Sequence, residues 1–194
     1  MFQRLNQKAG EARGKKVKDK MTPQGKKLFK ELQKLAELEV QVGFTSDGSG
    51  QGANHESVSA DDYENGPTVA EVAAWNEFGT YNIPERPFIR QSVEKNEAVI
   101  KAMCAEQLKE IAVGKADADK AIRAVGALQV GLMQHEIITG DFIENAPITI
   151  FGGWMKNKKS GKPFYVEGKD SSAPLIDSGR MRQSVHYVVK QKEG

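Results

Sequence analysis

The feature of this 194-residue sequence that most restricts its fold is the position of its strand-like stretches, which stand near both ends. Residues 38–44 alternate between apolar and polar or small side chains, and residues 185–189 do the same. Between them, apolar side chains recur at helical spacing. We therefore expect an α+β fold in which an antiparallel sheet packs against two or three helices.

Four stretches have the spacing of amphipathic helices. The first covers residues 26–36, and the second covers residues 69–78, between the capping box Thr68-Val-Ala-Glu71 and Gly79. The expected buried side of this second helix consists of Val69, Val72, Ala73 and Phe78. A long helix should run from Pro87, as its first residue, to about Ala112, and another from Gly114 to about Gly140. The short link between these two predicts antiparallel packing.

The remaining segments are shorter or less regular. Residues 148–151 are strand-like, residues 152–163 are typical of an exposed basic hairpin or loop, and residues 174–184 predict a short helical turn. Residues 45–66 form a polar, Gly-rich loop that is longer than an ordinary connection. These patterns predict a flexible basic arm over residues 1–25 and a single α+β domain over residues 26–194.

Charge is distributed unevenly along the chain. The net charge is +2, but residues 1–38 contain eleven Lys or Arg against four Asp or Glu, which leaves −5 for residues 39–194. A basic arm of this kind binds phosphates or an acidic neighbouring subunit, or remains a solvated tail. The basic candidates for a contact with DNA or a partner are Lys15, Lys16, Lys18 and Lys20 in the arm, and Lys156, Lys158, Lys159 and Lys162 farther on.

The sequence argues against several classes of function. No apolar stretch approaches the roughly 20 residues that span a bilayer, and the first residues lack the apolar run of a secretory signal, so we expect a cytoplasmic product without a membrane partner. Three scattered histidines and the lone Cys104, expected to be a small core residue, predict no catalytic, metal or cofactor site. The carboxylates of Glu77 and Asp177 stand beside turns, where capping or ion pairing is expected.

Two segments resemble a known family. The first is Val69-Ala-Glu-Val-Ala-Ala-Trp-Asn-Glu-Phe-Gly-Thr-Tyr-Asn-Ile-Pro-Glu-Arg-Pro-Phe-Ile-Arg90, followed by Gln-Ser-Val-Glu-Lys-Asn96. It resembles the signature of tail-completion (neck) proteins of tailed bacteriophages, most specifically over residues 77–88. The string Pro174-Leu-Ile-Asp-Ser-Gly-Arg-Met-Arg-Gln-Ser-Val185 is similar to the closing segment of the same family. Ser178 and Met181 stand where that family usually has Thr and Leu, and the arm lies outside the shared pattern.

This resemblance implies a non-enzymatic virion subunit, made in the host cytoplasm and assembled at the neck or the head-proximal end of the tail. Such proteins form closed rings, commonly hexamers, around the channel through which DNA passes. The implied partners are further copies of the chain, the adjacent head-closure or adaptor and tail terminator or tube proteins, and packaged DNA. The alternatives are a tail terminator or head-closure protein of the same neck, and a small cytoplasmic nucleic-acid-binding protein that uses the basic arm.

The residues of the two matching segments carry separate hypotheses. Pro84 and Pro87 should stiffen the turn, Phe88 should anchor it to the core, and Gly79 should permit a left-handed helix stop. Charged residues of the first segment either bridge subunits or pair within the chain. The candidate interface or turn-organising residues are Glu77, Phe78, Gly79, Thr80, Pro84, Arg86, Pro87, Phe88, Arg90, Asp177, Gly179 and Arg180.

Overall fold

The computed structural model of this chain describes residues 21–44, 68–157, 160–169, 171–176 and 179–192. The predictions for the arm before residue 21, for the loop over residues 45–66, and for Lys158, Lys159 and Asp177 lie outside the described residues. Within the described part, the chain forms seven helices and two antiparallel two-stranded sheets. The expected α+β class is confirmed.

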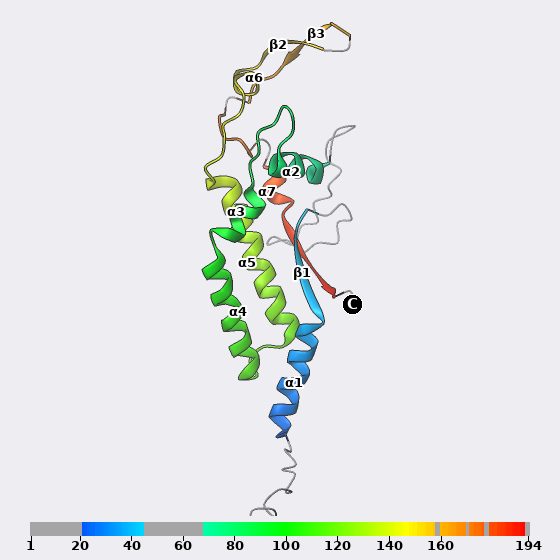
Figure 1. Ribbon diagram of the computed structural model, residues 1–194, viewed down its shortest axis with the longest axis vertical. Coiled ribbons are helices and arrows are strands. Elements are labelled where there is room, and N and C mark those ends of the chain that lie inside the picture. The colour runs from blue at the N-terminus through cyan, green and yellow to red at the C-terminus, as the bar shows by residue number, and fades with distance from the viewer. Residues whose placement is uncertain (1–20, 45–67, 158–159, 170, 177–178, 193–194) are drawn as a thin grey trace, which may run out of the picture.

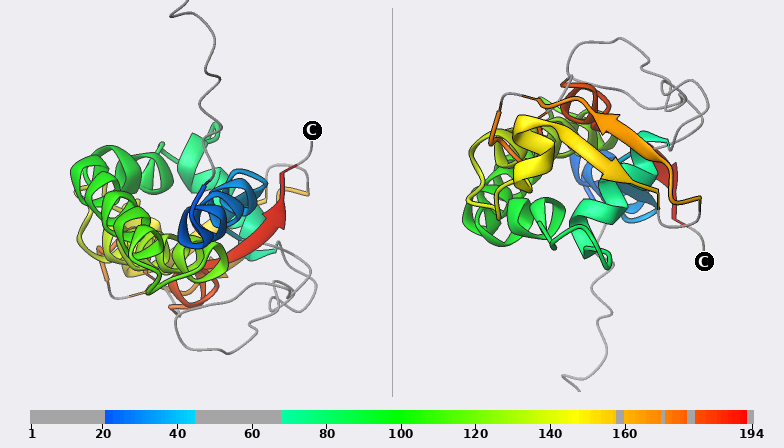
Figure 2. Two further views of the ribbon diagram at one scale, coloured as in Figure 1. Left: turned by 90° about the horizontal axis from the view of Figure 1, so that it is seen from below. Right: turned by 90° about the horizontal axis from the view of Figure 1, so that it is seen from above.

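The two strand-like ends of the domain pair with each other. β1 (Leu38–Gly43) lies antiparallel to β4 (His186–Gln191), with Val40 opposite Val189 and Val42 opposite Tyr187. Residues two apart along a strand share one face of the sheet. This apolar face packs on α5 (Ala118–Thr139), so the first and last strands of the domain lie side by side against the same helix (Figures 1 and 2).

The helices form a second layer beside this sheet. α1 (Pro23–Ala36) begins at an N-cap in which the Thr22 hydroxyl accepts a hydrogen bond from the Gly25 N–H. α4 (Glu97–Ala112) and α5 lie antiparallel to each other, as their short link predicts (Figure 1). Cys104 is half-buried and lines a small groove between α1, α4 and α5.

The long helix expected over residues 87–112 is in fact two helices. α3 (Phe88–Glu94) and α4 are separated by Lys95 and Asn96. The side-chain amide of Asn96 donates to the Ser92 carbonyl at 2.9 Å, and local bonding of this kind competes with continued helix. Pro87 is not the first helical residue, because its ψ of 61° is outside the helical range and places it at the N-cap of α3.

The strand expected at residues 148–151 is also wrong, because α6 (Pro147–Phe151) is a short helix with Pro147 at its first position. A short apolar run cannot by itself distinguish a strand from a helical turn. For the basic segment after it, the sequence predicts a hairpin or a loop. It is a hairpin, formed by β2 (Gly153–Lys156) and β3 (Pro163–Val166). α7 (Arg180–Gln183) confirms the short helical turn before the last strand.

The hydrophobic core lies where α2 (Val69–Phe78), α3, α5 and the sheet meet. Its buried members come from α2, α3, α5 and the closing segment of the chain, and Val40, Val42 and Phe44 pack against them. The buried members are Val69, Ala73, Phe88, Val130, Met133, Ile137, Leu175, Met181, Val185 and Tyr187. The side chains of Phe88, Val130 and Val185 have no exposed surface. This core joins the sheet, the central helix and the segment at residues 77–90 into one unit.

One expected core residue of α2 is misplaced. Val69 and Ala73 are buried as predicted, but Phe78 is 77% exposed. The next position on the buried face, four residues beyond Ala73, belongs to Glu77, which is 4% exposed. The prediction favours Phe78 over Glu77 because burying an unpaired carboxylate costs free energy. Glu77 avoids this cost through hydrogen bonds described below.

Two glycines of α5 allow a matched test of the packing between helix and sheet. A Cβ added at Gly126 would lie 2.7 Å from the Tyr187 ring and 2.8 Å from Val40, whereas one at Gly131 would meet nothing within 4 Å. Gly126→Ala should therefore lower the free energy of unfolding by about 1 to 3 kcal/mol through overpacking. Gly131→Ala should raise it by about 1 kcal/mol through helix propensity. Urea denaturation measures the free energy of unfolding of both variants. Equal changes in the two would contradict the close approach of α5 to the sheet at Gly126.

Candidate functional site

The segment over residues 77–90 folds into a corner between α2 and α3. Gly79 ends α2 with a φ of 70°, which favours glycine, as expected for a left-handed stop. Its ψ of 169°, however, is extended and differs from that of the left-handed helical conformation. Thr80 closes the next turn, because its N–H donates to the Ile83 carbonyl and its hydroxyl accepts from the Ile83 N–H. The Arg86 N–H then donates to the Asn76 carbonyl at 2.7 Å, which returns the chain to α2.

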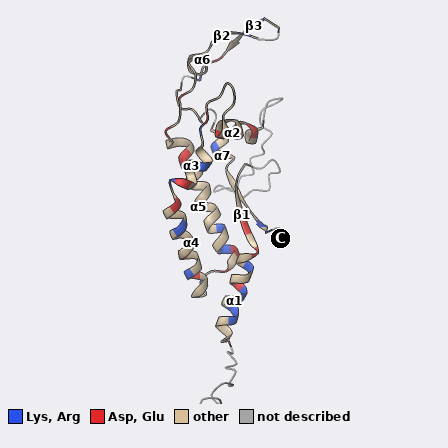
Figure 3. Ribbon diagram, in the orientation of Figure 1, with Lys and Arg blue, Asp and Glu red and all other residues tan. Residues whose placement is uncertain are grey.

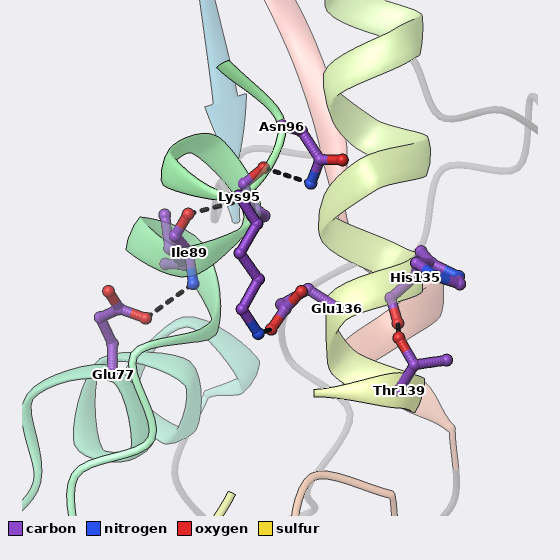
Figure 4. A network of polar contacts seen from close by, with 8 residues as sticks. Glu77, Ile89, Lys95, Asn96, His135, Glu136 and Thr139 are labelled. Carbon is purple, nitrogen blue, oxygen red and sulfur yellow. Dashed lines mark hydrogen bonds and ion pairs between the residues drawn. The ribbon is translucent and has the colours of Figure 1, made fainter. Parts of the chain in front are cut away.

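Glu77 holds the start of α3 in place. One carboxylate oxygen accepts a hydrogen bond from the backbone N–H of Ile89 at 2.8 Å (Figure 4). The other accepts a hydrogen bond from the backbone N–H of Arg90 at 3.1 Å. These N–H groups belong to the first turn of α3, which has no side-chain cap of its own. The carboxylate of a preceding helix therefore replaces a local cap, and the predicted capping role of Glu77 is confirmed.

Removing this cap should weaken the fold measurably. Glu77→Ala leaves two N–H groups in the first turn of α3 without their acceptor and should lower the free energy of unfolding by about 1 to 3 kcal/mol. Glu77→Gln keeps one acceptor oxygen and should have a smaller effect. Chemical denaturation gives the values, with the exposed Glu85→Gln as the matched control that should resemble the wild-type protein. If Glu77→Ala were as stable as Glu85→Gln, the hydrogen bonds from α3 to Glu77 would be dispensable for stability.

Arg86 is buried and bonded within the chain. Its guanidinium donates to the carbonyls of Ile143 at 2.8 Å and Glu144 at 3.2 Å, and to the side-chain oxygen of Asn76 at 2.9 Å. A longer hydrogen bond of 3.4 Å reaches Asn145. Burial lowers the pKa of Arg86 from its ordinary value, since desolvation disfavours the charged form. The side chain thus fixes the loop after α5 to the end of α2, and is not available to bridge subunits.

The other arginine of this segment, Arg90, lies at the surface and pairs with Glu85. This ion pair raises the pKa of Arg90 through the hydrogen bond from its guanidinium to the Glu85 carboxylate. Directly after α3, the ammonium of Lys95 pairs with the nearly buried carboxylate of Glu136 on α5 (Figure 4). The break after α3 places Lys95 where it faces this carboxylate. The corner is therefore tied to α5 by charge as well as by apolar packing.

The closing segment packs against the same corner. Leu175, Met181 and Val185 belong to the core that contains Phe88, whose expected anchoring role is thereby confirmed. Gly179 has a left-handed conformation, with φ 78° and ψ −3°, and leads into α7. Arg180 is half-buried, and its carbonyl accepts a hydrogen bond from the Ser184 hydroxyl. The two segments that carry the resemblance therefore meet in one place, although they lie far apart in the sequence.

The basic residues do not join this corner. Lys156 and Lys162 are exposed on the hairpin formed by β2 and β3, which projects beyond the end of the helices (Figure 1). Other charged residues are spread over α1 to α5 and β1 (Figure 3). On the hairpin, Trp154 lies opposite Tyr165, with ring centroids 5.6 Å apart in an edge-to-face arrangement. The structure thus combines lysines with aromatic rings in the projecting hairpin.

Sequence reasoning missed several residues of these arrangements. Asn76 and Asn145 accept hydrogen bonds from the Arg86 guanidinium. No sequence signal identifies them, because only the tertiary fold brings these residues next to Arg86. The aromatic residues of the hairpin carried a signal that was available. Apolar residues occupy neighbouring positions in both strands, as Trp154-Met155 and Phe164-Tyr165, so both faces of the ribbon are apolar.

The described residues contain no group of three or more His, Cys, Asp or Glu side chains arranged to hold a metal ion. In the same part of the chain, no helix has the length and apolarity needed to cross a membrane. Comparisons of the chain with protein-family models, with curated proteins and with solved structures find no match.

Proposed function

We propose that this chain is a non-enzymatic structural subunit of a tailed-phage virion, which forms a ring at the neck or the head-proximal end of the tail and joins the tail to the head around the DNA channel. The observation that carries this proposal is the contact between the two resembling segments. Phe88 of the first shares one core with Leu175, Met181 and Val185 of the second. This contact supports treating the two resemblances as one pattern of one fold.

The exposed aromatic side chains also support a role in an assembly. Of the twelve aromatic residues in the described part of the chain, eight are exposed, and four of these lie between residues 151 and 165. Clustered apolar side chains at a surface mark a site of protein interaction. A small domain that uses two different surfaces for successive contacts builds a closed ring when the rotation between copies closes.

Electron cryo-microscopy of the virions that contain this chain tests the proposal. We expect rotationally symmetric density between the portal and the tail tube that accommodates the body formed by α2–α5, β1 and β4. The same map gives the number of copies and distinguishes a tail-completion position from a terminator or head-closure position. Neck density that other chains explain completely would reject the proposal.

Disruption of the gene provides an independent test. A phage without this subunit should accumulate DNA-filled heads and separate tails, and expression of the chain from a plasmid should restore joined particles. Normal numbers of joined, infectious particles without the subunit would contradict a role in joining the tail to the head.

A further inference from the structure

The hairpin formed by β2 and β3 has the surface of an element that is covered by another molecule. Trp154 is 73% exposed and Tyr165 is 59% exposed on one face, while Met155 and Phe164 on the other face are 42% and 45% exposed. Among the described elements, the main contacts of each strand are with the other strand of the hairpin. An isolated two-stranded ribbon is only marginally stable in water, so this hairpin needs a partner surface.

The charge of the hairpin indicates what kind of surface it fits. Residues 147–166 contain four lysines and no carboxylate, whereas residues 68–144, which form α2 to α5 and the loop after them, contain eight Lys or Arg and twelve Asp or Glu. A second copy of the chain therefore offers a complementary charge to the hairpin. Two hairpins placed against each other would instead bring eight lysines together, which disfavours a symmetric contact.

The end of α5 and the loop that follows it match the hairpin in both apolarity and charge. We define four exposed residues of this stretch as the acidic strip: Ile138, Asp141, Ile143 and Glu144. Ile138 and Ile143 are 47% and 63% exposed, and both carboxylates of the strip are exposed. Because Arg86 binds the carbonyls of Ile143 and Glu144, the backbone of the strip is held in place before any partner arrives. Such a preorganised surface loses little conformational entropy on binding.

We propose that the Trp154 face of the hairpin binds the acidic strip of a second copy of this chain. Trp154 and Tyr165 then cover Ile138 and Ile143, and Lys156, which lies on the same face as Trp154, approaches Asp141 or Glu144. Nucleic acid would satisfy the lysine but has no counterpart to the exposed isoleucines. The contact joins different surfaces on the two copies, so each copy can bind a neighbour on both sides. This inference rests on the proposed ring and names the elements that would close it.

Sedimentation velocity on the purified full chain tests the inference, at concentrations up to about 0.5 mM, where even a weak interface is populated. The hairpin variant is Trp154→Ala with Tyr165→Ala, and the strip variant is Asp141→Lys with Glu144→Lys. Each should weaken self-association by at least about tenfold relative to the wild-type chain. Phe29→Ala, which removes an exposed aromatic ring from α1, is the control and should leave association unchanged.

Mixing the two variants gives the sharpest result. The hairpin variant keeps an intact strip and the strip variant keeps an intact hairpin, so the mixture should form a discrete one-to-one heterodimer that does not grow further. Thermal melting should show that both variants keep the stability of the wild-type chain, because none of the four residues belongs to the core.

Three results would overturn the inference. The first is a wild-type chain that remains monomeric over the whole concentration range. The second is unchanged association of both variants. The third is binding of a short single-stranded DNA that depends on Trp154 and Tyr165 in a chain that does not self-associate, which would make nucleic acid the partner of the hairpin. Each of these leaves the neck assignment to be decided by the virion map, so the two proposals fail separately.

Discussion

Phe88→Ala is expected to lower the free energy of unfolding by about 3 to 5 kcal/mol, the largest effect of any substitution considered. The Phe88 side chain has no exposed surface, and its ring contacts Phe44 edge to face at a centroid distance of 6.1 Å. It also joins the core segments from both ends of the domain. Truncation removes this burial and leaves a cavity that the surrounding helices and sheet can fill only in part.

The matched control for this experiment is Phe78→Ala, at a position ten residues earlier that is 77% exposed. That variant should unfold within about 0.5 kcal/mol of the wild-type chain in guanidinium titrations, because exposed side chains contribute little to the folded state. Equal losses in the two variants would show that the core is not organised around Phe88. A stable, folded Phe88→Ala chain that fails to form rings would place this residue at an interface instead.

Arg86→Ala is expected to lower the free energy of unfolding by about 3 kcal/mol. The substitution removes the donor of the hydrogen bonds to the backbone carbonyls of Ile143 and Glu144 and to the side-chain oxygen of Asn76. Arg86→Lys keeps the positive charge but cannot reproduce the several directed hydrogen bonds of the guanidinium, so it should recover only part of the loss. Equilibrium denaturation followed by circular dichroism provides the comparison.

The exposed Arg90→Ala provides the control for this substitution. Its ion pair with Glu85 lies in solvent, so the variant should unfold close to the wild-type midpoint. The alternative hypothesis for Arg86, a bridge between subunits, predicts the opposite pattern, in which Arg86→Ala folds normally but does not assemble. The backbone of the inferred acidic strip is held in position by Arg86. The Arg86→Lys chain, even where it is folded, should therefore associate more weakly than the wild-type chain.

The corner between α2 and α3 shows how far sequence reasoning reaches. The capping box at Thr68, the stop at Gly79 and the role of Phe88 follow from local rules about dihedral angles, caps and apolar spacing, and the structure confirms them. The exchange of Phe78 for Glu77 on the buried face does not follow from such rules. A carboxylate can be buried there only because α3 begins beside it and supplies two N–H groups.

The errors along the chain have the same physical origin. The break at Lys95 and Asn96 and the helix at Pro147–Phe151 occur where local patterns permit two conformations and neighbouring elements select one. For Lys95, the neighbouring element is α5, whose Glu136 receives the ammonium group. Helix propensity alone would continue the helix, and the tertiary contact favours the turn.

The sequence by itself determined the α+β class, the presence of strands near both ends of a helical middle, the caps and stops of α2, and the exposed position of the described part of the basic segment at residues 152–163. These features depend on spacing and on backbone preferences, which act over a few residues. Only the tertiary structure decided that Arg86 is buried, that the two resembling segments share one core, and that the acidic strip is held open to solvent. Those facts depend on contacts between residues distant in the chain, and no local pattern encodes which distant group will supply the partner.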